Sequence, residues 1–138
     1  MLTRRGFAAR TLDNGAFPPA VFGERRTPGA TRTIVFYMHY DGQPVTPSQW
    51  TTPPWQPVLR TKSLEEGGQV IPVPASGKVD GEARVYARSA SDDKSPIIAL
   101  LAALDALDAR QQRPSVLLKV CLDGVEVAGS GHVRTLRE

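Results

Sequence analysis

Apolar positions along the chain fall into short β-type runs and one long helical repeat. Runs rich in β-branched and aromatic residues, each bounded by turn-forming residues, predict strands over 20–24, 33–41, 83–88 and 115–124. The stretch 34–38 is continuously apolar, which is typical of a strand buried on both faces.

The clearest helix signal covers residues 96–110. Ser95 is placed to cap this helix, and Pro96 suits its first position. The side chains that recur at helical spacing are Ile97, Leu100, Leu101, Leu104 and Leu107. A last helix is expected over 131–138, with Ser130 as its cap.

Prolines and glycines concentrate between residues 42 and 82, where they exclude long regular elements. Strands on either side of this segment, together with the helix, predict an α/β fold with a mixed, largely parallel sheet and flanking helices. We expect residues 1–138 to form a single domain, because this length suits one core.

Composition narrows the classes of function. Apolar residues make up 41% of the 138 residues and charged residues 22%, which is typical of a globular protein. The net charge of +3 comes from arginines scattered between turn residues, so we expect no nucleic-acid partner. No apolar run approaches the roughly 20 residues of a membrane span, so no membrane partner is expected either.

The single cysteine, Cys121, cannot form an internal disulfide, which favours a reducing, cytoplasmic location. It lies in the apolar run "SVLLKVCL", which predicts a buried thiol rather than a nucleophile.

Histidine and acidic residues that could carry out chemistry cluster next to the ends of the predicted strands. His39 and Asp41 follow one strand, Asp92 and Asp93 precede the helix, and Asp123 with Glu126 closes another strand. Ligands of α/β sheets bind outside the carboxyl ends of the strands, so these clusters could share one site.

Each cluster also has a purely structural interpretation. His39 and Asp41 lie on one side of an extended backbone, as a metal-bound imidazole and its orienting carboxylate would, or as a hydrogen-bonded strand-end pair. Asp92 and Asp93 could bridge cations or simply favour a helix N-terminus. Glu126 could be a general base or a solvated loop carboxylate.

Three segments in register resemble the M20 metallopeptidases, which include di-zinc dipeptidases, carboxypeptidases and deacylases. They are "VFYMHYDGQPV", "YARSASDDKSPIIALLAALDAL" and "LDGVEVAGSG", where the family has forms close to "GHYDVQP", "GRGASDDKGP" and "EGEEEIGS". The resemblance implies the N-terminal part of a zinc-peptidase-like catalytic domain, with the downstream half and the lid or dimerisation domain absent.

The resemblance also implies a role for four residues. His39 matches a zinc ligand and Asp41 the aspartate that orients it, Asp92 matches the carboxylate that bridges two zinc ions, and Glu126 matches the general base. In such a site two cations polarise the amide carbonyl and lower the pKa of a bridging water, while the glutamate moves its proton.

The sequence departs from the family pattern at several positions. Val127 occupies the position of a glutamate that ligates zinc, and valine has no donor atom. Family glycines are replaced by Met38, Ala87, Ser89 and Ser95, where a side chain opposes close backbone approach or a positive φ. Only His39 and Asp92 of the usual five metal ligands are present, and a catalytic zinc normally takes three protein ligands.

We therefore expect a metal-dependent hydrolase of peptide bonds, dipeptidase-like and acting on small peptides, of which this chain is a truncated and inactive segment. The alternative is a diverged, non-catalytic homologue that acts as an interaction module or survives as a relic. Exposed sheet edges are further expected to support a homo-oligomer.

Overall fold

The computed structural model describes residues 1–125, and these form two compact units. The first unit is Met1–Asp41 together with the described residues from Asp93 onward, and the second is Gly42–Asp92. Among the described residues, no helix is long and apolar enough to cross a membrane.

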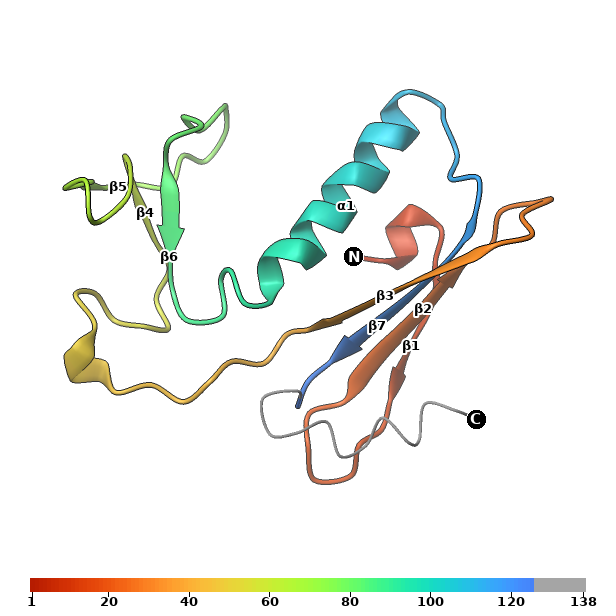
Figure 1. Cartoon of the computed structure of the whole chain (residues 1–138), viewed down its shortest axis with the longest axis horizontal. Coiled ribbons are helices and arrows are strands. Elements are labelled where there is room, and N and C mark those ends of the chain that lie inside the picture. Colours follow the sequence, from red (N-terminus) through yellow and green to blue (C-terminus); the bar gives the residue numbers. More distant parts are fainter. Residues whose placement is uncertain (126–138) are drawn as a thin grey trace. The chain divides into compact units, whose positions relative to one another are not determined.

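A four-stranded mixed sheet forms the first unit (Figure 1). Its order is β1 (Ala8–Leu12), β2 (Ala20–Arg25), β7 (Leu117–Asp123) and β3 (Thr33–His39). β1 pairs with β2, and β2 with β7, in antiparallel fashion, whereas β3 runs parallel to β7. The parallel pair requires a crossover, and helix α1 (Lys94–Ala109) provides it.

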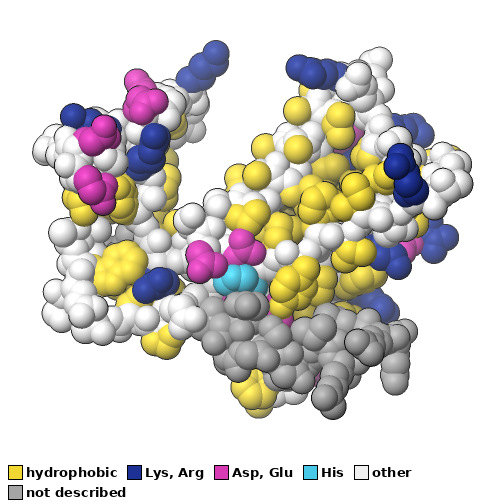
Figure 2. Space-filling view, in the orientation of Figure 1, with side chains coloured by type: hydrophobic (Ala, Val, Ile, Leu, Met, Phe, Trp, Pro, Cys, Tyr) yellow, Lys and Arg dark blue, Asp and Glu magenta, His cyan; other side chains and the backbone are white. Residues whose placement is uncertain are grey.

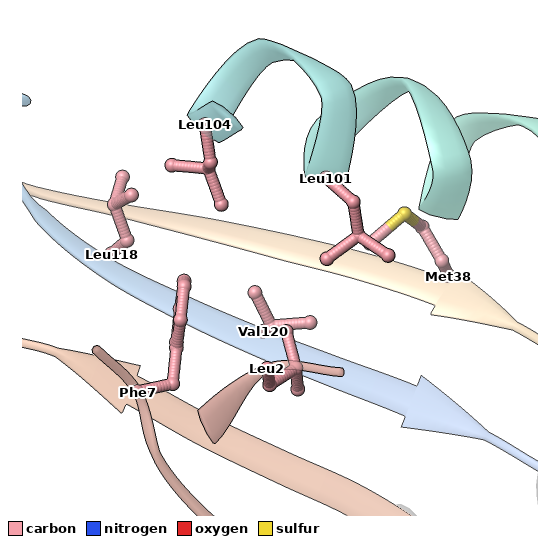
Figure 3. Packing of buried hydrophobic residues seen from close by; sticks show 7 residues of the cluster. All are labelled: Leu2, Phe7, Met38, Leu101, Leu104, Leu118 and Val120. Atoms are coloured by element: carbon pink, nitrogen blue, oxygen red, sulfur yellow. The ribbon is translucent and has the colours of Figure 1, made fainter. Parts of the chain in front are cut away.

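Helix α1 covers one face of this sheet and closes the hydrophobic core (Figure 3). Leu101 and Leu104 point from the helix toward the sheet. They face Leu118 and Val120 of β7 and Met38 of β3, and Val120 is completely buried. The cluster of buried side chains consists of Leu2, Phe7, Met38, Leu101, Leu104, Leu118 and Val120.

The N-terminal segment is tied to the same helix. A short 3-10 helix, η1 (Thr3–Arg5), brings Leu2 into the core, while the Arg5 Nε donates to the Asp105 carboxylate at 2.6 Å. From β2, Arg25 pairs with Asp108 one helical turn further on, at 3.1 Å. Two ion pairs therefore fix the C-terminal half of α1 over the sheet.

The second unit consists mostly of loops. Its three short strands, β5 (Val70–Ile71), β4 (Val58–Arg60) and β6 (Arg84–Tyr86), form an antiparallel sheet in that order. A second 3-10 helix, η2, spans Pro47–Gln49. The abundance of proline and glycine between residues 42 and 82 explains why no longer element forms there.

The α/β fold with a mixed sheet and a covering helix is confirmed, but its parallel share is smaller than expected. Among the described residues only β3 and β7 pair in parallel. The sequence signal missed β1, β4 and β5, which are short or strongly exposed. The division into a single partial domain stays a prediction, and the helix expected over 131–138 lies outside the described residues.

Two local predictions were wrong. Strand β3 is not buried on both faces, because it lies at the end of the described sheet, where Val35 is 62% exposed. Helix α1 begins at Lys94, with Asp93 as its N-cap residue, so Ser95 and Pro96 lie inside the first turn. The Asp93 side chain makes no capping hydrogen bond, because it is engaged elsewhere.

The core depends on the buried side of α1 rather than on helix propensity. Leu104→Ala should lower the free energy of unfolding by about 2–5 kcal/mol, because it leaves a cavity where the side chain is 2% exposed. Ile98→Ala, on the same helix but 55% exposed, is the matched control and should change stability by about 0.5 kcal/mol or less. Equal losses in urea unfolding experiments would contradict this packing.

Candidate functional site

The parallel pairing of β3 with β7 brings two of the predicted clusters to the same end of the sheet. His39, the last residue of β3, is the register partner of Asp123, the last residue of β7. Tyr40 continues the ladder by donating its backbone N–H to the Asp123 carbonyl at 2.8 Å. Polar residues that are far apart in the sequence are therefore neighbours here.

His39 and Asp41 form the pair that their spacing predicts. The His39 Nδ1 lies 2.9 Å from the Asp41 Oδ1, and both side chains are largely buried, at 12% and 18% exposure. A carboxylate on one ring nitrogen fixes the orientation of the imidazole and directs its chemistry to the other nitrogen, Nε2. The geometry suits a metal-ligating histidine and equally suits a hydrogen-bonded strand end.

Asp93, the residue directly before α1, also contacts His39. We call the group of His39, Asp41, Asp93 and Asp123 at this end of the sheet the polar corner. The Asp93 Oδ2 accepts a hydrogen bond from the backbone N–H of His39 at 3.1 Å. The first residue before α1 thus holds the last residue of β3, which fixes where the helix starts relative to the strand. The neighbouring Asp92 is exposed and belongs to the second unit.

Asp123 has a structural role that the sequence did not reveal. It is 5% exposed, accepts a hydrogen bond from the Tyr37 hydroxyl at 2.8 Å and accepts another from the Val125 N–H at 2.9 Å. Tyr37 was not among the predicted residues. Its signal was strand parity, because Tyr37 and Asp123 occupy the same face of neighbouring strands.

These donors do not make a complete metal centre by themselves. Among residues 1–125, no group of three or more histidine, cysteine, aspartate or glutamate side chains is placed to hold a metal ion. The structure brings together His39, Asp41, Asp93 and Asp123, but as a hydrogen-bonded corner. Glu126 and Val127, which the sequence resemblance singled out, lie outside the described residues.

Ser89 adopts a strained conformation in the loop that leads to Asp92. Its φ is +66°, in the left-handed region that favours glycine, and its side chain is 4% exposed. The chain approaches Gly42 closely here, since a Cβ at Gly42 would lie 2.9 Å from the Ser89 Cβ. Ser89 is one of the residues that replace a family glycine, and its positive φ explains why a glycine suits this position.

Burial also raises the pKa values of two weakly acidic side chains near this group of residues, Cys121 and Tyr40. Burial raises the pKa of the Cys121 thiol, and the nearby Asp123 charge raises it further. Burial, followed by the charges of Asp123 and Asp41, raises the pKa of Tyr40. Cys121 is therefore a buried, protonated thiol, as expected, rather than an activated nucleophile.

The chain is similar in sequence to curated metallodipeptidases. It is 30% identical to the Cys-Gly metallodipeptidase dug1 of Schizosaccharomyces pombe over 86% of the chain and 21% of that protein. It is 31% identical to the human Beta-Ala-His dipeptidase over 88% of the chain and 20% of that protein. The chain thus spans about a fifth of the length of these relatives, and no family model matches it.

Solved structures show the same similarity in three dimensions. The crystal structure of human carnosine dipeptidase 1 superposes with a TM-score of 0.71 at 28% identity, covering 98% of this chain and 26% of that one. An M20 family metallo-carboxypeptidase from Sulfolobus solfataricus, Sso-CP2, gives a TM-score of 0.64 at 30% identity, covering 95% and 25%. The chain therefore shares both sequence and fold with one part of these enzymes.

The close approach of Gly42 and Ser89 can be measured by a double-mutant cycle. Gly42→Ala should destabilise the chain, because its methyl group collides with the Ser89 Cβ. In a Ser89→Gly background this loss should shrink by about 1 kcal/mol or more. Gly81→Ala, where a Cβ meets no atom within 4 Å, is the control. Additive effects in thermal unfolding would refute the contact.

The raised pKa of Cys121 predicts slow thiol chemistry. A raised pKa leaves less thiolate at any given pH, so alkylation by iodoacetamide should be slow in the native chain and accelerate on unfolding. The native rate should also rise with pH only above the range of free cysteine, whose pKa is about 8.5. Alkylation of the native chain as fast as that of free cysteine would contradict the burial.

Proposed function

Because the chain belongs to the M20 family of metallopeptidases and corresponds to their N-terminal part, we propose that it carries the first portion of a metal-dependent site that hydrolyses peptide bonds. The observation that supports this proposal most directly is the 2.9 Å hydrogen bond between His39 and Asp41 at the carboxyl end of β3. A ligand histidine in such a site needs an orienting carboxylate.

We assign roles by matching the family motifs to this sequence. His39 and Asp92 would be metal ligands, Asp41 would orient the imidazole of His39, and Glu126 would act as the general base. Two zinc ions, when bound, would polarise the substrate carbonyl and acidify a water molecule. The contribution of the described residues is to hold the imidazole, through Asp41 on its ring and Asp93 on its backbone N–H.

The number of metal-ligating side chains limits the activity that we can propose for this chain. His39 with Asp41 fits one ligand and its support, but the described residues as a whole do not fit a complete metal centre. Val127, where the family has a glutamate ligand, removes another donor. We therefore derive no catalytic step, and we propose that these 138 residues on their own do not turn over substrate.

The substrate class and location follow from the same family assignment. We propose a small, dipeptide-like substrate, in keeping with the relatives' names. A cytoplasmic location rests on the single, buried Cys121. We propose no nucleic-acid partner, since Arg5 and Arg25 are engaged with Asp105 and Asp108.

The alternative proposal is that the chain is a non-catalytic homologue that acts as an interaction module. Val127 favours it, because valine has no donor atom at the position where the family has a glutamate ligand. The strained Ser89 favours it as well, because a glycine would relieve the φ of +66° in the loop that leads to Asp92. In this alternative the His39–Asp41 hydrogen bond is inherited from a metal-binding ancestor and only stabilises the end of β3.

Calorimetric titration with zinc chloride separates these proposals. The unmodified chain should bind zinc weakly and show no hydrolysis of dipeptides, because its ligand set is incomplete. Val127→Glu should strengthen zinc binding if the inherited site persists, and His39→Ala in that variant should abolish the gain.

Glu65→Gln, which removes an exposed carboxylate elsewhere in the chain, is the control for nonspecific charge effects. Unchanged zinc affinity in Val127→Glu would favour the non-catalytic homologue. Efficient hydrolysis by the unmodified chain would overturn the proposal that the 138 residues are inactive.

A further inference from the structure

We propose that Asn14 is a modification site, at which the backbone nitrogen of Gly15 attacks the side-chain amide and releases ammonia. The product is an aspartate or an isoaspartate in the loop between β1 and β2, and Asp13 slows the reaction in the folded chain. This chemistry is independent of the proposed metal site. It rests on the identity of the reacting residues, the open space around the loop and the hydrogen bonds of Asp13 and Asn14.

The reacting pair is distinctive in this sequence. Asn14 is the only asparagine among the 138 residues, and a glycine follows it. Glycine favours closure of a succinimide ring, because it has no Cβ to obstruct the ring and has the widest choice of backbone angles. Asn–Gly is also common in two-residue hairpin turns, but residues 13–19 separate β1 from β2, so the pair does not form such a turn here.

The loop leaves room for the ring. Gly15 is exposed, its φ is +62°, and a Cβ placed on it would meet no atom of the described residues within 4 Å. The Phe17 N–H donates to the Asn14 carbonyl at 3.2 Å and closes a turn over Gly15. The loop lies at the lower end of the first unit in Figure 1, and Figure 2 shows hydrophobic side chains at the surface there. Water can therefore reach the ring and open it.

The reaction balances with water as its only co-reactant. The Gly15 nitrogen loses its proton and bonds to the Asn14 Cγ, while the bond from Cγ to Nδ2 breaks and the amide nitrogen leaves as ammonia with that proton. Water then adds to a carbonyl carbon of the ring, whose bond to the ring nitrogen breaks as that nitrogen takes up a proton. Opening at Cγ gives aspartate, and opening at the backbone carbonyl gives isoaspartate.

Asp13 holds the attacking nitrogen in its unreactive, protonated form. The Asp13 Oδ1 accepts a hydrogen bond from the Gly15 N–H at 3.0 Å, so the proton that must leave is already engaged. The carboxylate also opposes loss of that proton, because a nearby negative charge disfavours a second one. The folded loop should therefore react more slowly than the same sequence when it is unfolded.

The reaction would also change the contacts of the loop. The Asn14 Nδ2 donates to the Pro18 carbonyl at 3.2 Å, and this bond restrains the side-chain amide. An ionised aspartate or isoaspartate has no donor, so the product cannot make this bond. It also adds a negative charge next to Asp13. The modified loop therefore differs from the original in both charge and hydrogen bonding.

Incubation of the folded chain in mildly alkaline buffer, followed by trypsin digestion and mass spectrometry, tests the site. The tryptic fragment 11–25 carries Asn14 and should gain aspartate and isoaspartate forms with time. The rate should rise with pH, because the attacking nitrogen must lose its proton. Asn14→Gln keeps an amide but must close a larger ring, so it should slow acid formation in this fragment by about tenfold or more.

Asp13→Ala tests the restraint. It should raise the rate at Asn14 in the folded chain by about threefold or more, because it removes both the acceptor and the charge. Asp80→Ala is the matched control, since the Asp80 Oδ1 accepts the Glu82 N–H in the same pattern at 2.8 Å, and it should leave the rate unchanged. In concentrated urea, Asp13→Ala and the original chain should react at similar rates.

A fragment 11–25 that stays unmodified in the folded chain, while the chain in urea reacts, would overturn the proposal that Asn14 is a site in the native structure. Acid formation that is as fast in Asn14→Gln would overturn it as well. A slower reaction in Asp13→Ala would identify Asp13 as a base and overturn its proposed role as a restraint.

Discussion

The parallel pairing of β3 with β7 is the constraint on which the described structure depends. It requires the chain to cross over the sheet, and α1 makes that crossover while burying Leu101 and Leu104 against both strands. It also places the ends of the two strands side by side, so that His39 meets Asp123. The core and the polar corner are therefore two results of one strand arrangement.

Asp93 shows how closely packing and candidate chemistry are combined in this corner. As the residue before α1 it would ordinarily cap the helix, yet its carboxylate holds the His39 backbone instead. Asp41 holds the imidazole of the same residue. His39 is thus fixed at two points by residues from different elements, which is how a rigid scaffold prepares a functional side chain.

Much of the first unit could be predicted from sequence, because its elements have strong local signals. The repeat that includes Leu101 and Leu104 predicted α1, and the β-branched runs predicted β2, β3 and β7. The exposure of β3 could not be predicted, because it depends on sheet order rather than on local pattern. The support of His39 by Asp93, and the Tyr37–Asp123 contact, depend on tertiary register in the same way.

The hydrogen bond between His39 and Asp93 has a further consequence for how this fold tolerates change. The chain leaves the first unit after Asp41 and returns at Asp93, so the exit and the return are held side by side. A segment whose ends are already adjacent can lengthen or shorten at little entropic cost, since closure entropy grows only slowly with loop length. Evolution can therefore remodel the Gly42–Asp92 segment while the strand register of the first unit stays unchanged.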